Sequence, residues 1–333
     1  MIRDTVDLPA PPPTHHEDPR AQPREQHRTR PHHHDKFASP RPVTPGPDSV
    51  DRAKWTFENL LQAAARHAVP MGRRGAAVLA LCCVLVAAVS CGGPQPVGPA
   101  PEQLTVQVLS TRPHDPSSFT EGLEIDAGQL YESTGLDGHS LIRRSDATTG
   151  ANQVTVRLPD NLFGEGLTLA DGTLWQLTWQ DGFAIRRDPQ TLADRGHVPF
   201  AGEGWGLCHE PGRLVMSNGS DTLTFRNPAT FGVTGSVQVR QQGVPLDMLN
   251  ELECVDGVVW ANVWKTDQIV RIDPATGQVT ATVDANGLRG PSKNPDDGLN
   301  GIAAIAGTDH FLLTGKMWPT VFEVRFVPIR NAP

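Results

Sequence analysis

A short motif recurs five times between residues 119 and 303, and this repetition constrains the fold more than any other feature of the chain. The copies are FTEGL at 119–123, FGEGL at 163–167, GEGWGL at 202–207, NELE at 250–253 and NGIA at 300–303. When they are aligned on Leu123, Leu167, Leu207, Leu252 and Ile302, the successive steps are 44, 40, 45 and 50 residues. Repeats of this length are typical of architectures built by stacking one supersecondary unit several times.

Each motif is followed by the same order of short patterns. An apolar run comes first, as in TLWQL at 173–177, and then an alternating run that ends in Asp or Asn and a turn, as in IVRIDPATG at 269–277. A further short strand follows, such as 278–283. Four short alternating strands in about 40–50 residues are typical of a β-propeller blade, and no segment has the pattern of a long amphipathic helix. The sequence therefore predicts an all-β fold, a five-bladed β-propeller.

The ends of the repeat array predict how the ring closes. The fifth repeat ends at residues 321–327, which leaves no room for its outer strand. Residues 104–109 (LTVQVL) precede the first motif and have a strand-like pattern. We expect this segment to supply the missing outer strand and so to cover an otherwise open sheet edge.

The charge balance excludes a strongly basic nucleic-acid binder. The formal net charge is −8, from 29 Lys and Arg against 37 Asp and Glu. Residues 92–333 hold 17 basic and 28 acidic residues, a balance of −11. An acidic domain of this kind attracts cationic peptide N-termini at low salt, and no nucleic-acid partner is expected.

The only long apolar run, residues 76–90, follows Arg73 and Arg74 and has the build of a signal peptide. It is short for a membrane span of about 20 residues. It ends at AVSC, which resembles a bacterial lipoprotein box with Cys91 as the lipidated residue. The alternative is ordinary cleavage nearby, which releases a soluble protein. Both predict an extracytoplasmic protein, either a cell-envelope lipoprotein or a secreted one, that meets the membrane only through a lipid anchor.

A signal peptide that begins at residue 71, which is Met, suggests that translation starts at Met71. The Pro- and His-rich residues before it are then an untranslated stretch, or a disordered leader if they are made. The expected organisation is a leader (1–70), a signal peptide with its lipoprotein box (71–91), a linker (92–103), the propeller (104–327) and a tail (328–333).

Two cysteines lie within the predicted propeller, Cys208 and Cys254, and they occupy matching places in adjacent repeats. Outside the cytoplasm they are able to form a disulfide. Two separate buried thiols explain the same pattern equally well, so both alternatives stay open.

The motifs FTEGL, LYESTG, FGEGLT, QLTW, GEGWGL, LNELE, ANVW, RIDPATG, LNGIA and TGKMWP together resemble the glutamine cyclotransferases of the plant and bacterial type. The resemblance covers about residues 104–327. It implies a monomeric five-bladed propeller, an acyltransferase, whose central channel admits the N-terminal glutamine of a peptide or protein. The α-amine attacks the side-chain carboxamide, ammonia leaves, and a pyroglutamyl ring remains. The chemistry needs no metal or other cofactor. Whether a structural calcium ion binds at the channel is a question that the sequence leaves open.

The resemblance identifies Glu165, Asn250 and Lys316 as catalytic residues. An N-terminal amine with a pKa near 7.7–8.0 is mostly protonated at neutral pH, so a carboxylate must take its proton, and Glu165 is expected to act as this base and then as the acid. Asn250 donates to the oxygen that gains charge, and Lys316 assists. The structural alternative for the motif glutamates is that they hold turn N–H groups, and it applies to Glu121, Glu165, Glu203, Glu251 and Glu253. For Lys316 the alternative is a solvated lysine at a strand edge. Asn300 recurs in the fifth motif, where turn chemistry explains it equally well.

The substrate-binding residues implied by the resemblance are Phe119, Glu121, Phe163, Trp179, Trp205 and Trp264. The aromatic side chains pack on the glutamine stem and face its ammonium group. Glu121 is a departure, because many family members have Gln there; an ionised Glu accepts hydrogen bonds only, and it is suited to binding the cationic amine.

The remaining tryptophans and the histidines are not assigned to the substrate site. Trp175 and Trp260 follow strand alternation and are predicted in the blade core, whereas the sequence assigns Trp318 neither to the core nor to the pocket. The histidines of the domain show no zinc-ligand spacing.

Two other functions compete with the cyclotransferase. One is a propeller that binds peptides or cell-envelope partners without catalysis, because fold alone does not decide function. The other is a propeller enzyme of another class, such as a calcium-dependent lactonase. The presence of Glu165, Asn250 and the tryptophan set favours the cyclotransferase.

Overall fold

The computed structural model describes residues 98–290 and 296–329. The predictions for the leader, the signal peptide, lipidation at Cys91 and most of the tail lie outside these residues. The chain divides into two units, Met1–Ser90 and Cys91–Pro333, and only the second contains described residues. No helix in the described ranges has the length and hydrophobicity that crossing a bilayer requires.

The described residues form β-strands arranged in four-strand groups, which we number in chain order. Group 1 is β2 (Thr120–Asp126), β3 (Gln129–Thr134), β4 (Leu141–Asp146) and β5 (Asn152–Arg157). Group 2 is β6 (Gly164–Ala170), β7 (Thr173–Thr178), β8 (Phe183–Arg187) and β9 (Asp194–Pro199). Group 3 is β10 (Leu207–Glu210), β11 (Arg213–Met216), β12 (Thr222–Arg226) and β13 (Val233–Gln238).

The other two groups belong to one eight-stranded sheet. Group 4 is β16 (Leu249–Val255), β17 (Val258–Val263), β18 (Gln268–Ile272) and β19 (Val279–Asp284). Group 5 is β20 (Leu299–Ala304), β21 (His310–Gly315), β22 (Thr320–Pro328) and β1 (Glu102–Pro113). A small hairpin, β14 (Arg240–Gln241) and β15 (Val244–Pro245), lies between groups 3 and 4 in the chain.

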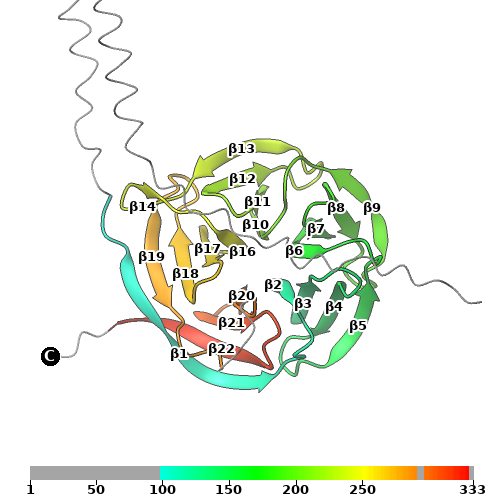
Figure 1. Cartoon of the computed structure of the whole chain (residues 1–333), viewed down its shortest axis with the longest axis horizontal. Helices are drawn as coiled ribbons and strands as arrows, with labels where there is room; N and C mark the ends of the chain where they lie inside the picture. The colour runs from blue at the N-terminus through cyan, green and yellow to red at the C-terminus, as the bar shows by residue number, and fades with distance from the viewer. Residues whose placement is uncertain (1–97, 291–295, 330–333) are drawn as a thin grey trace, which may run out of the picture. The chain divides into compact units, whose positions relative to one another are not determined.

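Strand β1 completes group 5, as the sequence predicted. It pairs antiparallel with β22, from Leu104 opposite Pro328 to Pro113 opposite Thr320. It is longer than the predicted 104–109, and its first residues also pair in parallel with β19. The first described strand thus joins the last group and its neighbour. Figure 1 shows the groups around a common centre, with β2, β6, β10, β16 and β20 innermost and β1 on the rim.

The packing between groups also closes the ring. Five buried apolar clusters each combine side chains from two neighbouring groups. The cluster that joins group 1 to group 5 contains Leu123 and Leu130 together with Ala303 and Leu312. Since successive side chains of a strand point to opposite faces, the apolar alternate positions of each sheet cover both neighbours. The result is an all-β, propeller-like fold.

The turn predicted after the alternating run is present in groups 1 to 4 and has a local cause. The Asp146 carboxylate accepts hydrogen bonds from the backbone N–H groups of Thr148 and Thr149 at 3.0 and 2.7 Å. Asp188 and Asn227 do the same in groups 2 and 3. Asp and Asn favour such turns because their short side chains satisfy backbone donors that leave the sheet ladder.

The innermost strands approach one another closely, which explains the glycines of the motif. The Gly166 N–H donates to the Trp205 carbonyl at 2.7 Å. A Cβ atom on Gly166 would lie 2.5 Å from that oxygen, and one on Gly206 would lie 2.1 Å from the Asn250 carbonyl oxygen. Only glycine leaves room for this approach.

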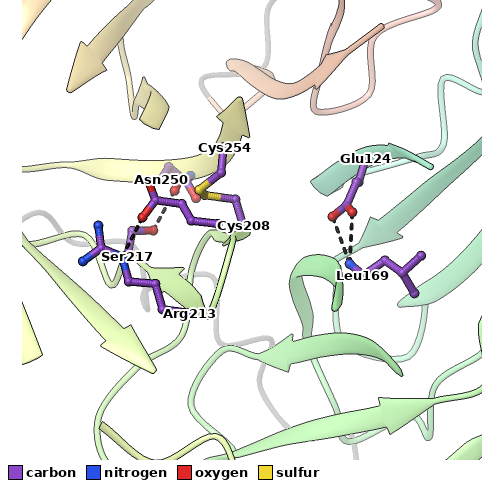
Figure 2. The surroundings of a disulfide bond; sticks show 8 residues. Glu124, Leu169, Cys208, Arg213, Ser217, Asn250 and Cys254 are labelled. Atoms are coloured by element: carbon purple, nitrogen blue, oxygen red, sulfur yellow. Dashed lines mark hydrogen bonds and ion pairs between the residues drawn. A yellow bond between two sulfur atoms is a disulfide. The ribbon is translucent and has the colours of Figure 1, made fainter. Parts of the chain in front are cut away.

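Cys208 in β10 and Cys254 in β16 form a disulfide, and the alternative of separate thiols is therefore wrong. Figure 2 shows this bond between the innermost strands of groups 3 and 4. Both tryptophans predicted for the core are buried there: Trp175 stacks near Phe231 and Trp260 contacts Phe311.

Candidate active site

Four polar side chains stand at the same position of four innermost strands, and we call this shared position a level of the ring. Glu121, Glu165, Asn250 and Asn300 each stand two residues before the aligned Leu or Ile of their repeat, and all four are buried. Equivalent positions on strands that surround a common centre lie at equivalent heights, which is why residues spread over 180 positions are able to share one site.

Lys316, directly after β21, joins this level through Glu121. Its Nζ donates to Glu121 Oε1 at 2.6 Å and lies 4.5 Å from the centre of the Phe119 ring. Asn300 Nδ2 donates to Glu121 Oε2 at 3.0 Å. Both charged side chains are almost fully buried, so Lys316 is not the solvated lysine of the structural alternative. Burial raises the pKa of Glu121, an effect that Lys316 and Asn300 oppose.

Glu165 differs from Glu121 in having a free acceptor. It is buried, and among the described residues its Oε2 has no hydrogen-bond partner. Burial raises the pKa of Glu165 well above its usual range, and the Glu121 and Glu203 carboxylates raise it further, whereas Lys316 opposes them. A carboxylate with an open oxygen and a raised pKa is suited to receiving a proton from a ligand.

The two asparagines also keep acceptor capacity. Asn250 Oδ1 and Asn300 Oδ1 are buried without a hydrogen-bond partner in the described part of the chain. The backbone of Asn250 is fixed, because Ser217 Oγ donates to its carbonyl oxygen at 2.6 Å (Figure 2). Asn300 also donates to the Thr120 carbonyl, so it belongs to this level rather than to a solvent-exposed turn.

The aromatic residues form two contacting sets around this level. Phe163 lies 6.2 Å from Phe119 and 5.5 Å from Trp179, measured between ring centres. Trp205 and Trp264 are 5.3 Å apart and nearly perpendicular. The three tryptophans are half-buried. The predicted aromatic residues thus form two groups, and Phe119 connects the group of Phe163 and Trp179 to Lys316.

Glu203 belongs to this site, although the sequence analysis gave this motif glutamate no binding or catalytic role. Its Oε2 accepts hydrogen bonds from the indole N–H groups of Trp179 and Trp205 at 2.9 and 3.0 Å, and its Oε1 accepts from Gln180 at 2.8 Å. The motif alignment did not indicate this role, because Trp205 and not Glu203 occupies the position equivalent to Glu165 in the third repeat. The acidic residue two places earlier in GEGWGL was the available signal.

Glu251 has the structural role that was the alternative for these glutamates. Its Oε1 accepts from the Leu123 N–H at 3.3 Å and its Oε2 accepts from the Ile302 N–H at 2.8 Å. The other repeats have glycine at this position, at Gly122, Gly166, Gly206 and Gly301. Glu251 therefore links β16 to β2 and β20, and burial raises its pKa well above the usual range.

Glu124 and Glu253 follow the same pattern further along the innermost strands. Both oxygens of Glu124 lie within 3.1 Å of the Leu169 N–H, which joins β2 to β6 (Figure 2). Burial raises the pKa of Glu124 to about 7. Burial also raises the pKa of Glu253 well above its usual range, and Glu124 and Glu251 add to this effect.

Three of the described histidines, His114, His197 and His310, lie in ion pairs with carboxylates. His114 contacts Glu132 Oε1 at 2.9 Å and the Trp318 carbonyl at 2.7 Å, and although burial opposes it, Glu132 raises the pKa of His114. Trp318 itself is buried and donates to the Asp297 carbonyl at 2.7 Å, so it belongs to the core. In residues 98–290 and 296–329, no group of three or more His, Cys, Asp or Glu side chains is placed to hold a metal ion.

The fold and this level define an all-β, propeller-like protein with a carboxylate and lysine site where its innermost strands meet. Residues 77–326, which are 250 of the 333 residues, match the profile of the glutamine cyclotransferase family. The chain is 36% identical over 230 residues to a glutaminyl-peptide cyclotransferase of Arabidopsis thaliana, covering 66% of this chain and 71% of that protein. It also resembles the crystal structure of Myxococcus xanthus glutaminyl cyclase, with 37% identity and a TM-score of 0.65, covering 69% of this chain and all of the other.

The chain therefore belongs to the glutamine cyclotransferase family, and it is an enzyme of the glutaminyl-peptide cyclotransferase type.

Proposed function

We propose that this enzyme converts the N-terminal glutamine of peptides or proteins to pyroglutamate and releases ammonia. The five strand groups are the blades of a five-bladed propeller, and the substrate enters the central channel by its N-terminus. Family membership supports the reaction, and the buried level of carboxylates, lysine and asparagines supports the place where it occurs.

One observation carries the assignment of Glu165 as base and acid: its buried Oε2 has no partner among the described residues. The incoming α-ammonium group supplies the missing donor. Glu165 takes a proton, the free amine attacks the side-chain carbonyl carbon, and a tetrahedral intermediate forms. Glu165 then returns the proton to the departing nitrogen, and the carbon–nitrogen bond breaks as the oxyanion forms the carbonyl again. The ring nitrogen gives its second proton to the departing ammonia, which leaves as ammonium. Because burial and the Glu121 carboxylate raise the pKa of Glu165, the pKa difference between this carboxyl and an N-terminal amine is smaller than for an ordinary Glu, and proton transfer in both directions needs less driving force.

The neighbouring polar groups stabilise the charge that develops. Asn250 donates its amide to the carbonyl oxygen as that oxygen becomes an oxyanion, and Lys316 supplies positive charge at the same level. The Glu121 carboxylate fixes the Lys316 ammonium group through the 2.6 Å contact and adds negative charge for the substrate amine. Because the ring closure is intramolecular, holding the side chain folded toward the amine removes much of the entropic barrier.

The aromatic residues bind the rest of the glutamine. Trp179, Trp205 and Trp264, with Phe119 and Phe163, pack on its methylene groups and face its ammonium charge. Their packing also excludes water, which strengthens the polar contacts below them.

The test is E165Q in the purified enzyme, assayed by ammonia release from a glutamine-initiated peptide. We expect turnover to fall by roughly 10²–10⁴-fold, because the variant retains the shape of the side chain but cannot accept the proton. E253Q is the matched control, because the carboxylates that act on Glu253 are those of Glu124 and Glu251 and not that of Glu165. This variant should leave turnover near that of the wild type. Near-native turnover in folded E165Q contradicts the assignment. A chelator is included, because the proposed mechanism needs no metal.

We also propose that the enzyme works outside the cytoplasm as a monomer. The Cys208–Cys254 disulfide supports an oxidising compartment. The lipoprotein box supports anchoring through Cys91, with release as a secreted protein as the alternative.

A further inference from the structure

One carboxylate connects two of the tryptophans that flank the site. Glu203 Oε2 accepts from Trp179 Nε1 and from Trp205 Nε1, at 2.9 and 3.0 Å. Trp179 follows the second strand of group 2, and Trp205 precedes the first strand of group 3. The shared oxygen therefore fixes two rings from different groups relative to each other.

The rest of Glu203 is held as firmly as its shared oxygen. Gln180 Nε2 donates to Oε1 at 2.8 Å, and the N–H of Gly204 donates to the Trp179 carbonyl at 3.0 Å. Glu203 is half-buried, so its hydrogen bonds to the indoles are partly shielded from water. Charge-assisted bonds of this kind are about twice as strong as neutral ones, and a buried indole N–H needs such an acceptor.

Glu203 also acts on the proposed base without contacting it. Its charge is among those that disfavour ionisation of Glu165, although no hydrogen bond joins the two side chains. Glu203 thus affects the site in two separable ways, by holding ring planes and by contributing a negative charge.

We infer that Glu203 is a positioning residue that sets the orientation of the Trp179 and Trp205 walls for binding of the substrate's N-terminal residue. This inference rests on the proposed function. It predicts that geometry, rather than charge, is what Glu203 contributes to substrate binding.

Two substitutions separate the geometry from the charge. E203A removes the shared acceptor and leaves both indole N–H groups without it. E203Q keeps one carbonyl oxygen in place for the two indoles, and its amide group is able to donate to Gln180 once that side chain turns its own oxygen inward. E203Q therefore retains the ring geometry but loses the charge.

The experiment measures kcat and KM for a glutamine-initiated peptide across pH, together with intrinsic tryptophan fluorescence. For E203A we expect KM to rise roughly 10-fold, as when a hydrogen bond to a charged group that orders a binding wall is lost, with kcat changed much less. For E203Q we expect KM and the emission spectrum close to those of the wild type. Both variants should shift the acidic limb of kcat/KM to lower pH, because both remove the charge that raises the pKa of Glu165.

D247A is the matched control, since Asp247 is an exposed carboxylate just before β16. It should leave KM and emission unchanged. An unchanged KM in E203A overturns the inference, and so does an equal rise in E203A and E203Q, because charge alone then explains the effect. If E203A does not fold, Q180A frees only Oε1 and should give a smaller rise in KM, and an unchanged KM there overturns the inference. An inactive wild type would instead reject the proposed function.

Discussion

The ion pair between Glu121 and Lys316 should set the pH range in which the enzyme works, and E121Q tests this directly. The two side chains meet at 2.6 Å in a buried setting, and Asn300 donates to the other carboxylate oxygen. The substitution retains an acceptor for the lysine but removes one negative charge. Lys316 is then left without its counterion next to Glu165.

Both changes favour the ionised form of Glu165, because Glu121 raises its pKa and Lys316 lowers it. In a protein site with an effective dielectric constant near 20, one charge at about 6 Å changes an ionisation free energy by about 3 kcal/mol, or about 2 pH units. Relaxation and water entry reduce this value. Since activity requires ionised Glu165, we expect the acidic limb of kcat/KM in E121Q to move to lower pH by about 1–2 units.

The assay is ammonia release from a glutamine-initiated peptide between pH 4 and 9, under conditions where rate is proportional to kcat/KM. Breaking a buried ion pair costs about 3–5 kcal/mol of folding stability, so each protein is assayed at a temperature well below the midpoint of its own thermal unfolding. E253Q is the control, because it also removes a carboxylate of the innermost strands but not one that acts on Glu165. An acidic limb that stays in place in folded E121Q would refute the electrostatic reasoning.

Two further predictions concern stability and are measured by urea unfolding. The folded pKa of Glu124 is raised from 4.5 to about 7, so the folded protein binds the proton more tightly, and its contribution of up to about 3 kcal/mol is present below pH 4.5 and lost as pH rises through 7. E124Q should lack this dependence, and a wild type and variant that differ equally at pH 5 and pH 8 would contradict it. Replacing Cys208 and Cys254 together by Ala opens a link across 46 residues and should lower the free energy of unfolding by about 4 kcal/mol. A loss below about 1 kcal/mol would mean that packing alone holds groups 3 and 4 together.

Most of the fold was predictable because strand period and repeat spacing encode it locally. The alternating runs that end in Asp146, Asn227 and Asp273 formed the expected strands and turns. The role of residues 104–109 followed from counting, since the fifth repeat lacks one strand and the chain has one unassigned strand at the other end. Only its extension to Glu102–Pro113 and its pairing with β19 were not foreseen.

The candidate site was predictable as a set of residues but not as a set of contacts. Motif alignment placed Glu121 and Glu165 at one level, and Lys316 was expected near them. The pairing of Lys316 with Glu121 spans 195 residues, and no local pattern encodes it. The disulfide was similar, because matching positions in two repeats made it feasible without deciding it.

Glu203 and Glu251 show why the sequence did not decide the role of each motif glutamate. Each departs from the repeat alignment: Glu203 precedes the aligned position that Trp205 occupies, and Glu251 stands where the other repeats have glycine. Their functions depend on donors from neighbouring groups, such as the Trp179 indole and the Ile302 N–H. Side-chain contacts between repeats arise from the closed ring, so a single repeat carries no sign of them.

The most direct test of the central claim is the product formed from a peptide that begins with glutamine. The purified enzyme is incubated with this peptide, and with the same peptide acetylated at its N-terminus, and both are followed by mass spectrometry and ammonia detection. The account predicts one pyroglutamyl peptide and one ammonia for each glutamine peptide consumed, and no change in the acetylated peptide, whose amine cannot attack. An unchanged glutamine peptide in the presence of folded enzyme would contradict the account, and binding without conversion would favour a non-catalytic propeller instead.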